Sequence, residues 1–201
     1  MVWHALERTN IPSTDAISWL LDTGSYGEPL KPVMFDAAHP ESLLSWFDVR
    51  VLVRQVIAGL HAHGLQPNDC VYTLAPNSIY YYPIVLGIIG SGAIVCNGSV
   101  LNTPIETKDF FVKAQAAWMI VHPAFIAHTE FLLAAGLLDR RRTVLFDLGL
   151  NKSGSDHDEI LQTWSGLRLS QFIMCGERDW VRITDKVTAE NTIAMRGFTS
   201  G

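Results

Sequence analysis

A long stretch without charged side chains constrains the fold of this chain more than any other feature. Between Cys70 and Ile105 there is no Asp, Glu, Lys or Arg, although charged residues make up 17% of the sequence. Such a segment lies in a membrane or inside a folded domain. Its most apolar part, Ile79 to Val95, is near the lower limit for a membrane span, and proline and glycines interrupt it. We therefore expect a helix buried on all sides, followed by a buried strand.

Capping residues in the sequence predict where two helices begin. Ser45 and Asp48 have the spacing of a capping box, and Gly64 predicts the end of the helix that follows. Thr103-Pro104-Ile105-Glu106 combines an N-cap residue, a proline at the first helical position and an acid two residues later. The first helix carries apolar residues at helical spacing. They are Val49, Leu52, Val53, Val56, Ile57 and Leu60.

Strands and helices alternate along most of the chain. We expect strands at Lys31 to Ala37, Cys70 to Ala75, Ala93 to Cys96, Trp118 to Val121, Thr143 to Phe146 and, from a weaker pattern, Leu169 to Met174. Further helices are expected at Ala16 to Leu21, Pro83 to Gly90 and Pro123 to Leu138. The polar run Asn151 to Glu159 is typical of a surface loop. The alternation predicts an α/β fold, a layered and mostly parallel sheet flanked by helices.

Composition narrows the classes of function. The net charge of -5 gives no electrostatic basis for binding nucleic acid, and no signal peptide or membrane span is expected. The cysteines Cys70, Cys96 and Cys175 form no CxxC pair, so we expect buried thiols in a reducing, cytoplasmic setting.

Most constellations that could carry chemistry are absent or incomplete. His61 and His63 point to different faces of a helix, and the other histidines have no partners at ligand spacing, so no metal site and no catalytic residue is assigned. There is neither a G-x-S-x-G elbow nor a complete Walker A pattern. The glycines from Gly87 to Gly92 are expected to allow close helix–strand packing. Tyr80-Tyr81-Tyr82 fits a helix entrance with surface hydroxyls better than an aromatic ligand platform.

The last residues of the sequence are Phe198-Thr199-Ser200-Gly201. Thr-Ser-Gly is how a Ser/Thr/Gly-rich loop that holds phosphates begins, because hydroxyls and backbone N–H groups together suit an anion. Thr199, Ser200 and Gly201 are therefore candidate phosphate-binding residues.

Four segments together resemble the N-terminal part of the adenylate-forming, or AMP-binding, acyl-CoA synthetases, specifically those similar to 4-coumarate–CoA ligases. They are Ser45 to Leu65, Gln66-Pro67-Asn68-Asp69-Cys70-Val71, Pro76 to Ala93 and Thr103-Pro104-Ile105-Glu106. The resemblance is strongest to fungal members, over about residues 11–125 and again over 191–201. Asn68 stands where the family has a turn glycine, and Thr107 replaces a leucine.

The resemblance implies a ligase that uses ATP and Mg²⁺ to convert a carboxylic acid to an acyl-adenylate and then transfers the acyl group to CoA, in secondary metabolism. Residues 1–201 would be one partial AMP-binding domain, with a loop-rich part at 147–168 and a truncated phosphate loop at 198–201. The remaining catalytic motifs would lie beyond it.

Two functions follow from this organisation. The first is a truncated acyl- or aryl-CoA synthetase-like protein that is inactive by itself and needs no cofactor alone. The second is a non-catalytic module that binds a protein partner such as a full-length synthetase. The carboxylic acid would be a ligand only if the remainder of the ligase were present. Residues 1–201 do not indicate which acid it is.

Overall fold

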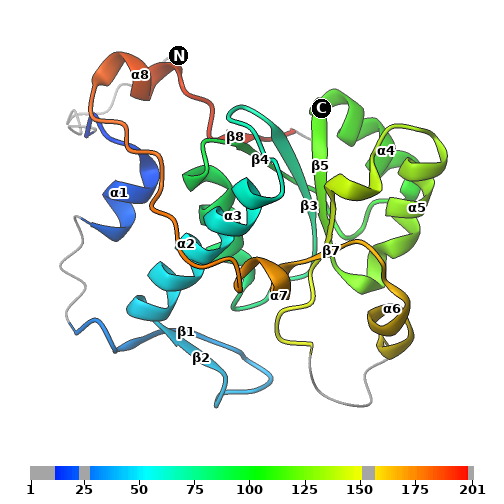
Figure 1. The fold of residues 1–201 in the computed structure, drawn as a ribbon, viewed down its shortest axis with the longest axis horizontal. Helices are drawn as coiled ribbons and strands as arrows, with labels where there is room; N and C mark the ends of the chain where they lie inside the picture. The colour runs from blue at the N-terminus through cyan, green and yellow to red at the C-terminus, as the bar shows by residue number, and fades with distance from the viewer. Residues whose placement is uncertain (1–11, 23–27, 151–156, 199–201) are drawn as a thin grey trace, which may run out of the picture.

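A six-stranded parallel sheet forms the centre of the computed structural model (Figure 1), which describes residues 12–22, 28–150 and 157–198. The strand order is β7-β6-β5-β3-β4-β8, and every neighbouring pair is parallel. The strands are β3 (Cys70–Leu74), β4 (Ile94–Asn97), β5 (Ala116–Val121), β6 (Thr143–Leu145), β7 (Leu167–Arg168) and β8 (Met195–Arg196). The predicted α/β class with a mostly parallel sheet is confirmed.

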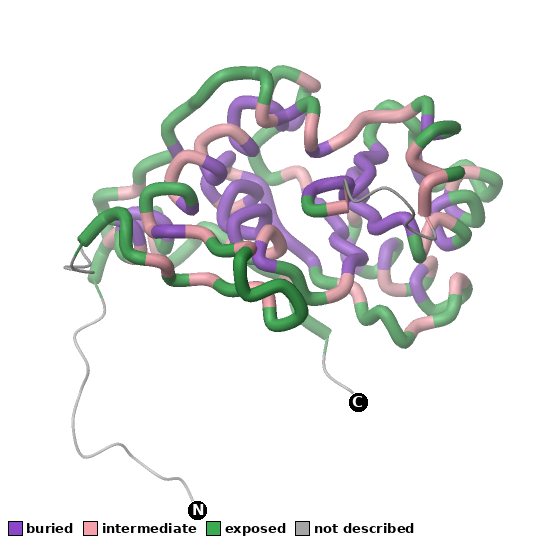
Figure 2. Tube along the Cα trace, turned by 90° about the horizontal axis from the view of Figure 1, so that it is seen from below, coloured by how far each residue is buried: buried purple, intermediate pink, exposed green. Residues whose placement is uncertain are grey.

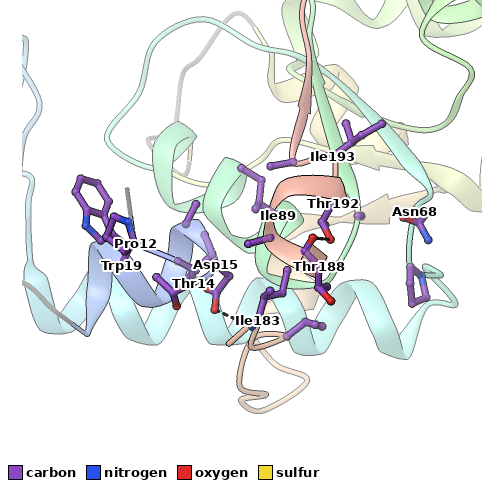
Figure 3. Close-up of a pocket in the computed structure, with 18 residues that line it drawn as sticks. Pro12, Thr14, Asp15, Trp19, Asn68, Ile89, Ile183, Thr188, Thr192 and Ile193 are labelled. Carbon is purple, nitrogen blue, oxygen red and sulfur yellow. Dashed lines mark hydrogen bonds between the residues drawn. The ribbon is translucent and has the colours of Figure 1, made fainter. Parts of the chain in front are cut away.

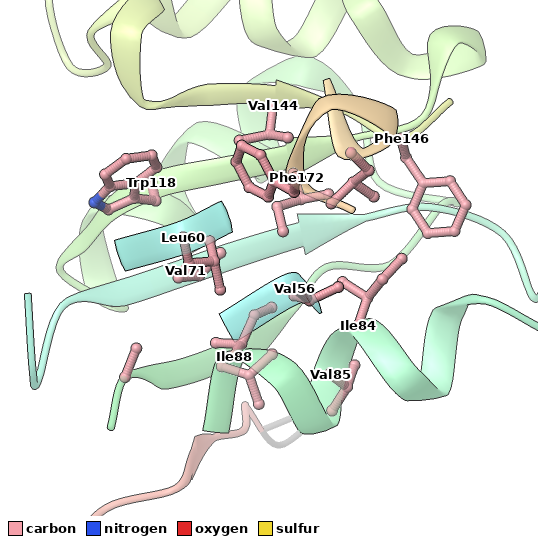
Figure 4. Packing of buried hydrophobic residues seen from close by; sticks show 14 of the residues in the cluster. Val56, Leu60, Val71, Ile84, Val85, Ile88, Trp118, Val144, Phe146 and Phe172 are labelled. Atoms are coloured by element: carbon pink, nitrogen blue, oxygen red, sulfur yellow. The ribbon is translucent and has the colours of Figure 1, made fainter. Parts of the chain in front are cut away.

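Helices cover both faces of this sheet, and each face has its own core. Alternate strand residues such as Val71 and Trp118 pack with α2 (Trp46–Ala62), α3 (Tyr81–Gly90) and α7 (Leu169–Phe172), as Figure 4 shows for one core. The opposite face packs against α4 (Pro104–Lys113), α5 (Ile126–Ala134) and α6 (Asp158–Thr163). Side chains of successive strand residues point to opposite faces, so a strand buried on both faces is a continuous apolar run. Buried segments fill the centre of the molecule (Figure 2). All five residues of β3 and most residues of α3 and β4 are buried, which accounts for the absence of charge in these elements.

The predicted helix starts are confirmed in atomic detail. The Asp48 side chain accepts the Ser45 backbone N–H at 2.8 Å, and the Ser45 hydroxyl accepts the Asp48 N–H at 3.2 Å. Thr103 and Glu106 form the same reciprocal cap, with Pro104 as the first helical residue. Gly64 follows α2 with a φ of 92°, a conformation that glycine adopts without a steric penalty.

Smaller elements surround the layers. They are α1 (Ala16–Leu21), the antiparallel pair β1 (Pro32–Phe35) and β2 (Leu43–Ser45), the 3-10 turns η1 (Pro123–Phe125) and η2 (Arg140–Arg142), and α8 (Lys186–Asn191). The segment before α8 crosses back over α1 and α2. There Trp180 is 4% exposed and donates to the Ser18 hydroxyl at 2.9 Å, and the guanidinium groups of Arg50 and Arg182 lie 5.5 and 4.7 Å from its ring centroid.

Two predictions about local structure were wrong. The strand expected at Leu169 to Met174 is the helix α7, which begins where Asp147 accepts the backbone N–H of Ser170 at 2.9 Å. Gly87 and Gly90 permit close packing against helix α2, not against a strand. A Cβ on Gly87 would lie 2.5 Å from Val56 Cγ1, and one on Gly90 would lie 2.9 Å from the Cδ1 of Ile57.

Cysteine burial departs from expectation at one position. Cys70 and Cys96 are buried, as predicted, but Cys175 is exposed. Within the described ranges, no helix is both long enough and apolar enough to cross a membrane.

Candidate functional site

The carboxyl ends of the central strands lie at one edge of the sheet, because all the strands are parallel. Open α/β sheets bind ligands in the crevice outside this edge. The chain leaves β4 at Gly98, β5 at His122, β6 at Phe146 and β8 at Gly197. The side chains at this edge therefore form the candidate site.

A hydrogen-bonded polar group joins β3, β4 and α3 here. The Thr73 hydroxyl donates to Asn97 Oδ1 at 2.9 Å and lies 3.1 Å from the Tyr81 hydroxyl. Thr73 is buried, so these bonds satisfy a hydroxyl that would otherwise be costly inside the domain. The arrangement fixes the carboxyl ends of two neighbouring strands. It also corrects the expectation for the tyrosine run, since one of its hydroxyls points inward.

The Tyr72 ring makes the turn after β4 tight. A Cβ on Gly98 would lie 2.6 Å from the Tyr72 hydroxyl oxygen, so only glycine fits there without movement. Burial raises the pKa of Tyr72 to about 12 and raises the pKa of Tyr81 as well. Both side chains remain neutral phenols at physiological pH, suited to hydrogen bonding and not to proton abstraction.

Two histidines meet at the end of β5. The rings of His122 and His157 are 5.2 Å apart and nearly perpendicular, and His122 Nδ1 accepts the Ala124 N–H at 3.2 Å. Burial, aided by His157, lowers the pKa of His122 from 6.5 to about 4. The His122 imidazole is therefore neutral near pH 7. The spacing of these histidines in sequence gave no signal for their contact, because His157 lies in the connection after β6 and meets His122 only once β5 and β6 are paired.

Strand β8 leads the described chain towards this edge, where the description ends at Phe198. Arg196 pairs with Cys96 of β4, and its guanidinium donates to the carbonyl of Ala114 at the end of α4. The Phe198 ring packs on Phe110 of α4 with centroids 5.0 Å apart. The predicted phosphate-binding residues Thr199, Ser200 and Gly201 lie outside the described residues, so their role stays a prediction.

No metal ion is assigned to this edge. In the part of the chain that the structure describes, no three His, Cys, Asp or Glu side chains lie together in a way that could hold one. The hydrogen-bonding groups of Thr73, Asn97, Tyr81 and His122 at this edge are neutral and can position a ligand.

Comparison with protein families matches residues 23–201 to the family described as AMP-binding enzyme. Among curated relatives, the phenylacetyl-CoA ligase epaB of Aspergillus niger is 34% identical over 192 residues, covering 96% of this chain and 34% of that protein. The 4-coumarate–CoA ligase 2 of Nicotiana tabacum is 34% identical over 94 residues, covering 47% of this chain and 17% of that protein. The chain thus spans about a third of the length of the first of these relatives.

Solved structures share the fold. The anthranilate CoA ligase AuaEII, in complex with anthranoyl-AMP, superposes with a TM-score of 0.73 at 18% identity, covering 95% of this chain and 32% of that one. A Brucella canis acyl-CoA synthetase superposes with a TM-score of 0.69 at 16% identity, covering 96% of this chain and 33% of that one. With its parallel sheet, its capped helices and the family match over most of its length, the chain belongs to the AMP-binding enzyme family.

Proposed function

We propose that these 201 residues are the N-terminal part of an acyl- or aryl-CoA ligase, and that they do not catalyse the reaction by themselves. In this proposal the phosphate loop begins after Phe198, with Thr199, Ser200 and Gly201 as its first ligands to ATP. The observation that carries it is the path of β8, which runs parallel to β4 and leads the chain to the carboxyl edge of the sheet.

The proposed reaction needs more than this edge. The carboxylate attacks the α-phosphate of ATP, giving an acyl-adenylate and pyrophosphate, and CoA then displaces AMP through its thiol. ATP would supply the activated phosphate, Mg²⁺ would neutralise its charge, and neither step is assigned to a described residue. Curated relatives carry about three times the length of this chain, and we place the rest of the reaction machinery in the additional part.

Substrate and setting are inferred from the relatives. The phenylacetyl-CoA ligase and the acyl-CoA ligase among them are fungal, which supports an aromatic or aliphatic carboxylic acid and a role in secondary metabolism. We propose a cytoplasmic location, in keeping with an enzyme that consumes ATP and CoA.

Pyrophosphate exchange into ATP tests this proposal. The 201-residue chain is assayed with a panel of aromatic and aliphatic acids, beside the Aspergillus niger epaB ligase with phenylacetate as the positive control. We expect no exchange from the 201-residue chain. Acid-dependent exchange by it would overturn the claim of inactivity. The mass of the protein in its source is measured in parallel against 22.3 kDa. If the native protein is longer than 201 residues and shows no pyrophosphate exchange with any acid of the panel, that result would contradict the proposal that it is an acyl- or aryl-CoA ligase.

A non-catalytic, partner-binding module is the second candidate. Apolar side chains are exposed around β8 and α4, where Leu101 is 90%, Ile105 64% and Met195 51% exposed. Apolar surface of this kind often marks a protein interface, and β8 is an edge strand. Light scattering of the chain with and without the full-length epaB ligase separates the candidates. A monomer that forms no complex would refute partner binding.

A further inference from the structure

A cavity of about 700 Å³ lies at the end of the sheet opposite the candidate site. Its walls come from α1, α8 and the loops that lead into β3 and β4, as Figure 3 shows. Asn68 precedes β3 and Ala93 precedes β4, so these residues mark the amino ends of the strands. The cavity is therefore separate from the carboxyl edge that β8 reaches.

The lining is mainly apolar. Ile89, Val181, Ile183 and Ile193 contribute aliphatic side chains, and the Trp19 indole, 52% exposed, lies on α1 at one side. A volume of this size is within the range of about 300–1,000 Å³ that is typical of small-molecule sites, which are also mostly apolar. Thr14 and Thr188 add hydroxyl groups to opposite walls.

Charge restricts what this cavity can hold. Among the described residues that line it, Asp15 alone carries a charged side chain. Its carboxylate is already used, because Oδ1 accepts the Ser18 N–H at 2.6 Å and Oδ2 accepts the Ile183 N–H at 3.1 Å. With no Lys, Arg or His in this lining, an anion here would lose its hydration without gaining a counter-charge. Carboxylates, adenylates and CoA are therefore disfavoured.

We propose that this cavity is a binding site for a neutral, mainly apolar small molecule, distinct from the site of the acid and the nucleotide. The ligand would have a ring or short-chain body against the aliphatic wall and a hydroxyl or carbonyl group within reach of Thr14 or Thr188. This inference does not depend on the proposed ligase activity.

A ligand bound in this cavity would influence the other end of the sheet through the segment that leads into β8. Thr192, Ile193 and Ala194 line the cavity and lead directly into β8. The Ala194 carbonyl accepts the Val95 N–H at 3.0 Å, so a ligand that packs on this segment also supports the pairing of β8 with β4. Hydrogen exchange of the Val95 amide reports on that pairing, and bound ligand would slow it.

Two dyes with the same aromatic scaffold test the proposal. N-phenyl-1-naphthylamine is neutral, whereas 1-anilinonaphthalene-8-sulfonate carries an added sulfonate. Both are titrated into the 201-residue chain and followed by fluorescence. We expect one saturable site for the neutral dye and affinity at least tenfold weaker for the sulfonate. Failure of the neutral dye to bind, or equal binding of the two dyes, would overturn the proposal.

Variants with a large side chain in the cavity test whether the dye binds there. Ala189→Trp acts from α8 and Ala16→Trp from α1, so a folding defect in one does not remove the test. Ala62→Trp, at the exposed end of α2, adds the same side chain elsewhere. Circular dichroism establishes that each variant is folded.

The two filling variants should weaken neutral-dye binding at least tenfold, and Ala62→Trp should leave it within twofold. Unchanged binding in a folded Ala189→Trp or Ala16→Trp variant would place the dye elsewhere and overturn the proposal. Light scattering adds a separate outcome. A dimer that the filling variants convert to monomer would identify a second copy of the chain as the occupant, which would also overturn it.

Discussion

Gly59→Ala is expected to destabilise the domain, although alanine is the better helix former. Gly59 lies inside α2, where replacing glycine by alanine normally stabilises a helix by about 1 kcal/mol. Here the added Cβ would lie 2.2 Å from Phe172 Cβ and 2.6 Å from Phe172 Cα. Since Cα is backbone, no side-chain rotation removes the overlap, and α7 itself must move.

The magnitude follows from the two opposing effects. Overpacking a core costs about 1–3 kcal/mol, and deleting a buried phenylalanine costs about 3–5 kcal/mol. Phe172 is fully buried and stacks on His63, with ring centroids 4.9 Å apart, so displacing it loses part of the second cost. Taking about 3 kcal/mol for the displacement and subtracting about 1 kcal/mol for helix propensity leaves a net loss of about 2 kcal/mol.

Urea unfolding, followed by circular dichroism, measures this loss. With a slope of about 2 kcal/mol per molar urea, the midpoint should fall by about 1 M. Ala62→Gly, at the exposed end of the same helix, is the control and should lose no more than about 1 kcal/mol. A Gly59→Ala variant as stable as the parent would show that α7 does not pack on α2 as described.

Three further outcomes are expected. The pKa of His122 is lowered to about 4 in the folded protein, so between pH 6.5 and 4 the unfolded chain binds more protons than the folded one. The free energy of unfolding should therefore fall as the pH drops through this range. His122→Asn should make this fall smaller, as measured by urea unfolding at several pH values. Asp147→Ala should lower the free energy of unfolding by about 1–2 kcal/mol, because its carboxylate accepts both the N–H and the hydroxyl of Ser170, and an unchanged urea midpoint would contradict this. Arg196→Met should speed amide hydrogen exchange at least tenfold at Val95, whose N–H is donated to the Ala194 carbonyl next to β8, since it removes the guanidinium bond from β8 to the Ala114 carbonyl, whereas Arg142→Met should not.

Local signals in the sequence predicted the layered fold well. The caps at Ser45 and Thr103 act within three residues, so they can be read without knowing the tertiary structure. The uncharged run indicated buried strands for the same reason, since burial on both faces leaves no position for a charge. The error at Leu169 to Met174 has a tertiary cause. Apolar periodicity in a short segment does not distinguish strand from helix, and the capping carboxylate of Asp147 lies 23 residues from Ser170.

The candidate site was harder to predict from the sequence than the fold, because its side chains come from separate connections between the strands. His122 and His157 meet only after β5 and β6 are paired, and Thr73 reaches Asn97 only across two strands. The phosphate loop expected at 198–201 was predicted from consecutive residues, and it stays a prediction because residues 199–201 lie outside the described residues.

The two proposed sites, at opposite ends of the sheet, would have opposite electrostatic requirements, and this difference would separate their functions. A phosphate loop serves anions through hydroxyls, backbone N–H groups and cations. The cavity at the amino ends has one carboxylate, already held by two backbone N–H groups, among its described lining residues. A ligand suited to one end is therefore poorly suited to the other, and the segment from Thr192 to Ala194 joins them through β8. If both ends bind ligands, coupling between them must pass through the short pairing of β8 with β4, where the Val95 amide reports it.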